Sequence, residues 1–163
     1  MKFLRFLILP MALIVWTMPV LAQSAQVAFG TIRQDTGLPV EVTADNLAVD
    51  QATGMATFTG NVLIGQGEMR LSAAKVLVVY RAESQGISRL EATGGVTLVS
   101  GPDAAEAERA DYSIDAGTIV MSGNVLLAQG RSALTADRMT VQLSDGTAQM
   151  SGRVKTILQT GSD

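Results

Sequence analysis

The stretch Gly60–Gly67 (GNVLIGQG) determines how this chain is organised, because it returns almost unchanged as Gly123–Gly130 (GNVLLAQG). Weaker copies of its Gly-x-Val opening occur at residues 94–96 and 152–154, so this signal recurs at spacings of 34, 29 and 29 residues. The longer spacing implies a five-residue insertion (34 − 29), which we place in the polar segment Arg81–Gly86. A repeat of this length predicts an array of small units that together bury one continuous face.

Within each unit, apolar and polar residues alternate in two successive stretches. In the first unit a turn at Asp50–Gly54 is followed by Ala56, Phe58, Val62 and Ile64 in alternation. A period of two, bounded by Gly and Asp, is typical of strands with one buried face, whereas a helix needs a period of 3.6. We therefore expect an all-β fold of about four 29-residue repeats, each with two strands of about ten residues, arranged as an antiparallel meander of eight strands.

In the first strand of every unit, one pair of successive inward residues is three positions apart instead of two, which we call an odd step. An odd step moves all later side chains to the wrong face of the sheet unless one residue is accommodated in a bulge or bend. We expect four bends in register, which would curl the sheet along one line. The steps run from Ala44 to Leu47, from Ala73 to Val76, from Ala107 to Ala110 and from Ala136 to Met139.

Three of these bends carry an acidic residue, namely Asp45, Glu108 and Asp137. Calcium-binding repeats supply several oxygen ligands per turn, whereas these acids occur singly, about 29 residues apart. We expect them to satisfy backbone amides at the bend or to face solvent.

The chain divides into four segments. Lys2 and Arg5 precede an apolar run from Phe6 to Val20, so residues 1–22 are predicted to be a signal peptide cleaved after Ala22. The alternative is an uncleaved N-terminal anchor. Residues 23–39 form an N-terminal segment in which residues 27–33 could provide an edge strand, residues 40–159 form the repeat domain, and residues 160–163 form a short tail.

The composition argues against several functions. The chain has no His and no Cys, which excludes Ser-His and Cys-His nucleophile pairs, the usual transition-metal sites and disulfides. Without residues 1–22, 10 basic residues face 15 acidic ones, so no basic stripe is available for nucleic acid. We therefore expect a protein that is not an enzyme and that uses no metal or cofactor.

The inward face is predicted to be aliphatic, with several methionines and few rings. Such a face is most often a core, although unbranched side chains also adapt to irregular apolar partners. The residues assigned to this face are Leu47, Val49, Phe58, Val62, Ile64, Val78, Tyr80, Leu98, Tyr112, Ile114, Met121, Val125, Leu127, Met139, Val141 and Met150.

Over about residues 38–158 the chain resembles the OstA/LptA-like family. The resemblance is carried by Ala44-Asp45, by Phe58–Val62 followed by Gln66-Gly67, by Leu71–Lys75 and by the second set in Gly123–Gly130. It implies an open β-jelly roll whose groove shields the lipid A acyl chains of lipopolysaccharide, which the inward-facing residues above would contact. The chain would then be a periplasmic bridge between inner-membrane and outer-membrane transport proteins of the same jelly-roll type.

The resemblance also implies that copies join end to end through edge strands. Here these edges are predicted around residues 27–33 or 41–50 and around residues 147–158. Two other functions remain open: a membrane-tethered partner in the same pathway, which would keep its N-terminal helix, and a structural β-filament without cargo, which would have a tightly filled interior.

Overall fold

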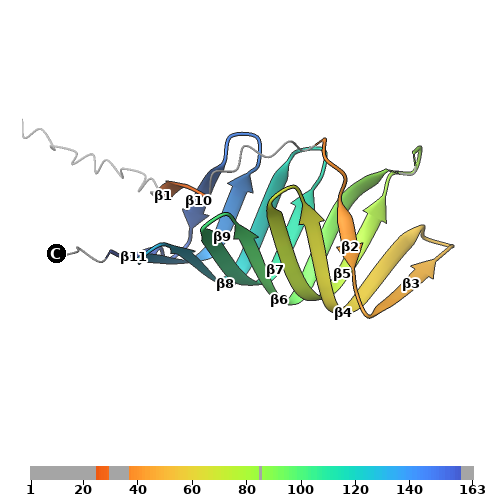
Figure 1. Ribbon diagram of the computed structural model, residues 1–163, viewed down its shortest axis with the longest axis horizontal. Coiled ribbons are helices and arrows are strands. Elements are labelled where there is room, and N and C mark those ends of the chain that lie inside the picture. Colours follow the sequence, from red (N-terminus) through yellow and green to blue (C-terminus); the bar gives the residue numbers. More distant parts are fainter. Residues whose placement is uncertain (1–24, 30–36, 85, 159–163) are drawn as a thin grey trace, which may run out of the picture.

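The computed structural model describes residues 25–29, 37–84 and 86–158, and all strands in this part of the chain belong to one antiparallel sheet (Figure 1). The sheet runs from β2 and β3 at one end to β1 and β11 at the other, so the predicted all-β meander is confirmed. Within the described residues there is no helix that could cross a membrane. The strands are β1 (Ala25–Ala28), β2 (Glu41–Thr43), β3 (Asn46–Asp50), β4 (Met55–Gln66), β5 (Met69–Tyr80), β6 (Ile87–Ser100), β7 (Asp103–Ser113), β8 (Thr118–Gln129), β9 (Ser132–Gln142), β10 (Thr147–Ser151) and β11 (Lys155–Ile157).

Ten of the eleven strands in the described residues correspond to the eight that the repeat predicts, because two of the predicted strands are interrupted. Both β2 and β3 pair with β4 and are the two halves of the first strand, while β10 and β11 both pair with β9 and are the two halves of the last. The remaining strand, β1, lies outside the repeat. The loop between β5 and β6 spans the predicted insertion at Arg81–Gly86.

Every long strand bends near its middle, and the bends divide the sheet into two walls. On β5, β7 and β9 the buried positions step by three across the bend, as predicted, and on β4, β6 and β8 they step by four. Wall A comprises β2, β11 and residues 62–66, 69–73, 96–100, 103–107, 125–129 and 132–136; wall B comprises β3, β10, β1 and residues 55–59, 75–80, 87–93, 109–113, 118–122 and 138–142.

The line between the walls, which we call the crease, is built from a recurring contact. At Gly123 φ is +83°, and a methyl group there would lie 2.5 Å from Oε2 of Glu108 on the neighbouring strand. The next residue, Asn124, also has a positive φ, of 48°, and its Nδ2 donates a 2.6 Å hydrogen bond to Oε1 of Glu108. Glycine is therefore required at the first of these positions, both for its backbone conformation and for the space it leaves.

The same contact recurs at two other bends, while the second unit uses smaller residues. Asn61 donates to Asp45 over 2.8 Å, and the guanidinium of Arg153 donates to Asp137 over 2.6 Å. In the second unit the acid is replaced by Ala74, which lies opposite two glycines at 94 and 95. The three acids thus bond to side chains across the crease. Asp45 and Glu108 are exposed and Asp137 is partly buried, so the expected solvent exposure holds for two of the three, whereas their side-chain partners were not predicted.

The inner faces of the two walls form the hydrophobic core. Side chains from both walls, such as Leu71 and Leu98 of wall A and Val76 and Met139 of wall B, are at most 2% exposed. The walls therefore pack against each other over the middle of the sheet.

The N-terminal strand differs from the prediction. It spans Ala25–Ala28, and residues 30–36, which include most of the predicted strand, lie outside the described residues. Instead of pairing with the first repeat, β1 pairs with β10, so residues 147–151 do not form a free edge. The sequence pattern could not reveal this, because alternation shows which face of a strand is buried but not which strand is its neighbour. The predicted signal peptide (1–22) and tail (160–163) also lie outside the described residues.

Candidate functional site

Most residues assigned to the inward face are buried between the walls. Eleven of the sixteen have side chains that are no more than 1% exposed, and Phe58 and Ile114 are partly buried and pack against the same core. The eleven are Val62, Ile64, Val78, Leu98, Tyr112, Met121, Val125, Leu127, Met139, Val141 and Met150.

Leu47 and Val49 are exceptions because they remain 57% and 63% exposed. Both face the interior, since they stand opposite Phe58 and Ala56 across the β3–β4 ladder, where paired side chains share a face. They are exposed because β3 is the last strand of wall B, with no strand beyond it in the described part of the chain. The interior thus opens to solvent at the β2–β3 end, and we call these two residues with Phe58 the mouth.

Tyr80 is the third exception, at 41% exposed. It stands opposite Ile87 at the end of β5, next to the loop before β6. A register shift separates Tyr80 from Val79, and the predicted burial of Tyr80 is wrong, because a strand end at a long loop has few neighbours to cover it.

Some buried residues were not assigned to the site, and three of them illustrate why. Leu90 continues the alternation of β6 and could have been found from it. Met69 lies at the first position of β5, where the turn hides the alternation. Phe29 is fully buried although it follows β1 by one residue, and no local pattern indicates this.

The edges of the two walls opposite the crease, which we call the rims, meet through side chains. The hydroxyl of Tyr112 on wall B donates a 2.5 Å hydrogen bond to Oε1 of Gln66 on wall A, whose Nε2 donates to the carbonyl of Leu38 over 2.9 Å. Burial raises the pKa of Tyr112 from 10.0 to about 12, against the opposing effect of the bond to Gln66. The interior is therefore closed at this point of the rim by a neutral phenol.

The repeat-related glutamine makes a similar contact. Gln129 occupies the place of Gln66 in the second copy of the motif, and its Nε2 donates to the carbonyl of Ala28 and, over 2.9 Å, to Asp103. Both glutamines therefore bind backbone carbonyls of the N-terminal segment, and the bond from Gln129 of wall A to Ala28 of β1 is a further contact between the two rims.

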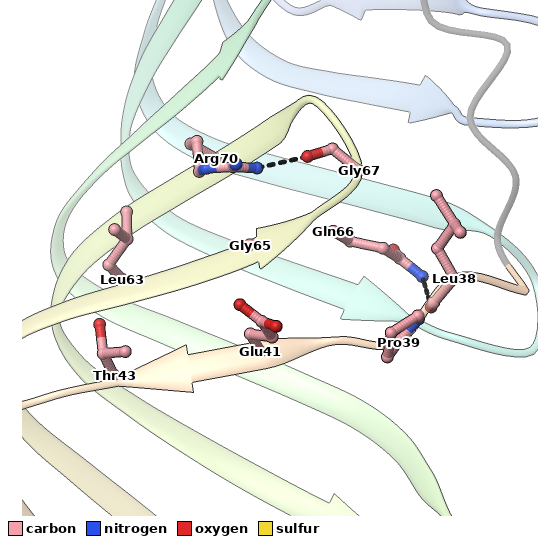
Figure 2. Close-up of a pocket in the computed structure, with 9 residues that line it drawn as sticks. All are labelled: Leu38, Pro39, Glu41, Thr43, Leu63, Gly65, Gln66, Gly67 and Arg70. Atoms are coloured by element: carbon pink, nitrogen blue, oxygen red, sulfur yellow. Dashed lines mark hydrogen bonds between the residues drawn. The ribbon is translucent and has the colours of Figure 1, made fainter.

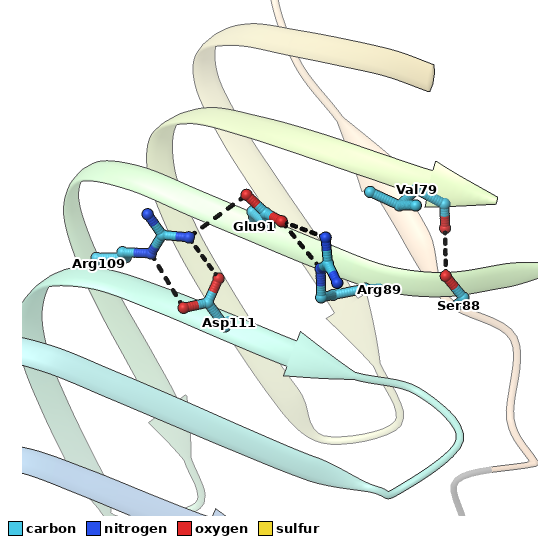
Figure 3. Close-up of polar contacts among 6 residues, drawn as sticks. All are labelled: Val79, Ser88, Arg89, Glu91, Arg109 and Asp111. Carbon is cyan, nitrogen blue, oxygen red and sulfur yellow. Dashed lines mark hydrogen bonds and ion pairs between the residues drawn. The ribbon is translucent and has the colours of Figure 1, made fainter. Parts of the chain in front are cut away.

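The outer face of wall B is polar, in contrast to its inner face. Arg109 forms ion pairs with Asp111 (2.9 Å) and Glu91 (3.4 Å), and Arg89 pairs with Glu91 over 2.6 Å (Figure 3). Hydrogen bonding to Asp111 raises the pKa of Arg109, which stays cationic. An apolar ligand would therefore find its environment inside the sheet rather than on this surface.

A depression of about 370 Å³ lies at the β2 edge of wall A (Figure 2). Its lining includes Glu41 and Arg70, and Nη1 of Arg70 donates to the carbonyls of Gly67 (2.6 Å) and Met69 (2.8 Å). These charged groups make it unsuitable for an aliphatic ligand. Within residues 25–29, 37–84 and 86–158, no three acidic side chains are grouped as a metal site would require.

Comparison with protein families identifies the group to which this arrangement belongs. Residues 41–147 and 112–157 match the family model described as LptA/(LptD N-terminal domain) LPS transport protein. The chain belongs to this LptA/LptD N-terminal family. The matched region contains both copies of the Gly-Asn-Val motif and all the crease contacts described above.

Three curated relatives match part of this chain, and two of them are lipopolysaccharide export system proteins LptA. The chain is 29% identical over 108 residues to an uncharacterized protein of Rhizobium meliloti, 36% identical over 67 residues to the lipopolysaccharide export system protein LptA of Haemophilus influenzae, and 30% identical over 71 residues to LptA of Escherichia coli K12. These matches cover 62%, 41% and 44% of this chain and 58%, 37% and 38% of the respective relatives. The chain thus spans little more than half of the first relative and less of the other two.

The jelly-roll fold of the LptA/LptD N-terminal family is also found among solved structures. The crystal structure of LptH from Pseudomonas aeruginosa, described as the LptA-homologous periplasmic component of a lipopolysaccharide transport device, aligns with a TM-score of 0.68 and 16% identity. The alignment covers 77% of this chain and 99% of that structure. At this identity the likeness establishes the fold.

Proposed function

We propose that this chain is a periplasmic bridge of lipopolysaccharide transport, which shields acyl chains between its two walls as the lipid moves from the inner to the outer membrane. The observation that carries the proposal is the contrast between an aliphatic interior, open at the mouth, and an outer face of wall B covered by ion pairs. Family membership supports the same function. Within this family the proposed role is transport, and no chemical step is assigned to any residue.

Acyl chains would enter at the mouth. Leu47 and Val49 present apolar surface to solvent there, and Phe58 connects them to the buried interior. Each methylene transferred from water to such a surface gains about 0.8 kcal/mol, so several chains together outweigh the cost of parting the walls locally. The rim contact between Tyr112 and Gln66 consists of one side-chain hydrogen bond, which can break and reform without disrupting a strand ladder.

The proposal is tested by photo-crosslinking to lipopolysaccharide. A photoreactive residue at Val49 should capture the lipid, whereas the matched control at Ala48, the neighbouring residue of the same strand, points to the opposite face and should not. A second pair, Met121 inside and Val120 outside, reports whether the lipid reaches the interior. Equal labelling within both pairs would contradict the proposal.

Two alternatives make different predictions in the same assay. A structural filament without cargo would show no lipid capture at Val49 or Met121 while still self-associating. A membrane-tethered partner would capture lipid but retain residues 1–22, which an intact-mass measurement of the exported protein detects.

The proposed partners are the jelly-roll proteins of the inner and outer membranes and further copies of this chain, joined end to end through strand edges. At one end the outermost strands are β2 and β3, and at the other they are β11 and β1. Unpaired strand edges are templates for strand addition, and head-to-tail contacts do not close on themselves. Sedimentation across a concentration series should therefore show species that keep growing rather than a single dimer.

A further inference from the structure

The two walls do not end at the same strand. On wall A the outermost strand is β11, and on wall B β1 lies one position further out, on β10. Since β10 and β11 are the two halves of one bent strand, β1 extends wall B past wall A by one strand, or about 4.8 Å. The two walls therefore offer different edges to an incoming molecule.

A second copy that continues both walls must place its β2 on β11 and its β3 on β10, because β2 and β3 are also the halves of one bent strand. Strand direction allows this. Each neighbour in the sheet is antiparallel to the next, so the incoming β3 would run antiparallel to β10. The structure already holds β1 antiparallel to β10 at that position.

The inward residues of β1 and β3 are of the same kind. Ala25 and Val27 of β1 face inward opposite Met150 and Ala148, with one outward residue between them. On β3, Leu47 and Val49 have the same spacing and are 57% and 63% exposed. Because Leu47 is larger than Ala25 and both β3 residues lack cover, an incoming β3 would bury more apolar surface on β10 than β1 does.

The charges on wall A fit the same contact. Lys155 on β11 and Glu41 on β2 are both exposed, and both lie on the outer face according to their register with Thr135 and Gly65. When β2 of one copy lies beside β11 of another with the ladders continued, Lys155 is level with Thr43, so Glu41 is its diagonal neighbour on the same face, within reach of these long side chains.

The C-terminal end of β1 is anchored by two contacts. Phe29 is fully buried and its N–H donates to the carbonyl of Gly146 over 2.9 Å, while the carbonyl of Ala28 accepts from Gln129. At the other end, Ala25 is partly buried and Gln26 is exposed. Release of β1 can therefore proceed with Phe29 still in place.

We propose that β1 is an intramolecular cap on β10, and that β3 of a second copy displaces it when copies join end to end. This inference rests on the end-to-end assembly proposed above. The cap keeps one edge of wall B covered in a free molecule, and assembly then depends on the fraction of molecules in which β1 is released, since apparent affinity scales with the competent fraction.

Gln26→Cys combined with Gln149→Cys tests the cap directly. The two residues are register partners, both are exposed on the outer face, and the chain has no cysteine of its own. Partner residues in antiparallel strands lie within the Cα separation that a disulfide spans. Oxidation therefore locks β1 on β10, and reduction releases it, in the same protein. The matched control is Val120→Cys with Thr140→Cys, an outer-face pair between β8 and β9 that lies away from both ends.

Sedimentation of oxidised and reduced samples across a concentration series gives the readout. We expect oxidation of the Gln26→Cys, Gln149→Cys double variant to abolish growth of the oligomers, the reduced form to assemble like the wild type, and the control pair to assemble in both states. Val27→Asp, which weakens the hold of β1 on Ala148, should strengthen association by up to about tenfold if roughly a tenth of molecules are released in the wild type.

Two results would overturn the cap. If the locked protein assembles as well as the reduced one, copies add to the outer edge of β1, and Val27→Asp should then weaken association. If neither state associates, no second copy displaces β1. Lipid capture at Val49 tests the lipid-binding function separately, so failure of the cap and failure of that function can be distinguished.

Discussion

The hydroxyl of Tyr112 on β7 donates a 2.5 Å hydrogen bond to the side-chain oxygen of Gln66 on β4, although two strands separate these elements in the sheet. The bond is possible because the crease folds wall B over wall A and brings their rims together. It joins the first and third repeats directly, whereas most contacts in the fold connect strands that are neighbours in sequence.

Removing this bond should destabilise the protein. Tyr112→Phe keeps the buried ring but leaves the Gln66 oxygen without this donor, and loss of a partner at a buried polar group costs about 1–3 kcal/mol. Urea denaturation measures the change. Tyr80→Phe, at a 41% exposed position, is the control and should change the free energy of unfolding little. An unchanged stability in Tyr112→Phe would show that the contact is not important for closing the rim.

The same residue predicts a loss of stability at alkaline pH. Because burial raises the pKa of Tyr112 from 10.0 to about 12, the folded state holds the phenolic proton more tightly than the unfolded state does. The stability that the protonated Tyr112 gives to the folded state is fully present below pH 10 and disappears as the pH rises towards 12. Thermal unfolding over this range should therefore show a steeper decline for the wild type than for Tyr112→Phe. Parallel curves would contradict the assigned cause.

The crease predicts a strong requirement for glycine at position 123. Gly123→Ala places a methyl group 2.5 Å from Glu108 Oε2 on a backbone with φ of +83°, so strain and collision add, at a cost of about 1–3 kcal/mol or more. Gly54→Ala is the matched control, since φ there is +68° and a methyl group meets nothing within 4 Å. Gly54→Ala should show the backbone strain alone, by urea denaturation, and an equal loss in both variants would exclude the collision.

The bend at Asp137 predicts that the stability of the fold depends on pH in the acid range. Hydrogen bonds from Arg153 lower the pKa of Asp137 below its usual value of 3.8. Because the pKa of Asp137 is lower in the folded state than in the unfolded state, ionised Asp137 stabilises the fold. This stabilisation is complete above the unfolded pKa and is lost as the pH falls through the folded pKa. Wild-type stability should therefore decline more than that of Asp137→Asn between neutral pH and about pH 3. Identical acid profiles would mean that the exposed pair contributes nothing measurable, as is common for surface ion pairs.

The repeat and its bends could be predicted from the sequence because both are local. Alternation identifies inward residues such as Met121 and Met139, and the odd step from Ala136 to Met139 identifies a bend without any structure. The glycines that accommodate the bend belong to the same motif that revealed the repeat. Local patterns of this kind survive because one slip in parity would expose a whole strand.

The contacts between distant segments could not be predicted in the same way. Nothing near Val27 indicates that β1 crosses to β10, and nothing near Gln66 indicates that its partner is Tyr112. Exposure at the mouth was also missed, because Leu47 has the same inward parity as a buried residue and differs only in lacking a neighbouring strand. Whether a strand lies at the end of the sheet depends on how the whole sheet assembles. The alternation of residues along one strand does not reveal it.

Inward-facing residues are separated by three or four positions where a strand crosses the crease. Because these steps fix how each strand bends, the width of the domain is set by the steps, whereas its length is set by the number of repeats. Inserting or deleting one residue at a bend would turn the rest of that strand inside out, so the cross-section tolerates no gradual change. Adding or removing a whole repeat, however, restores every step and shifts the far end by two strand spacings, about 9.6 Å. A lineage can thus lengthen or shorten this domain only in increments of that size, while the chemistry of its lining is inherited unchanged.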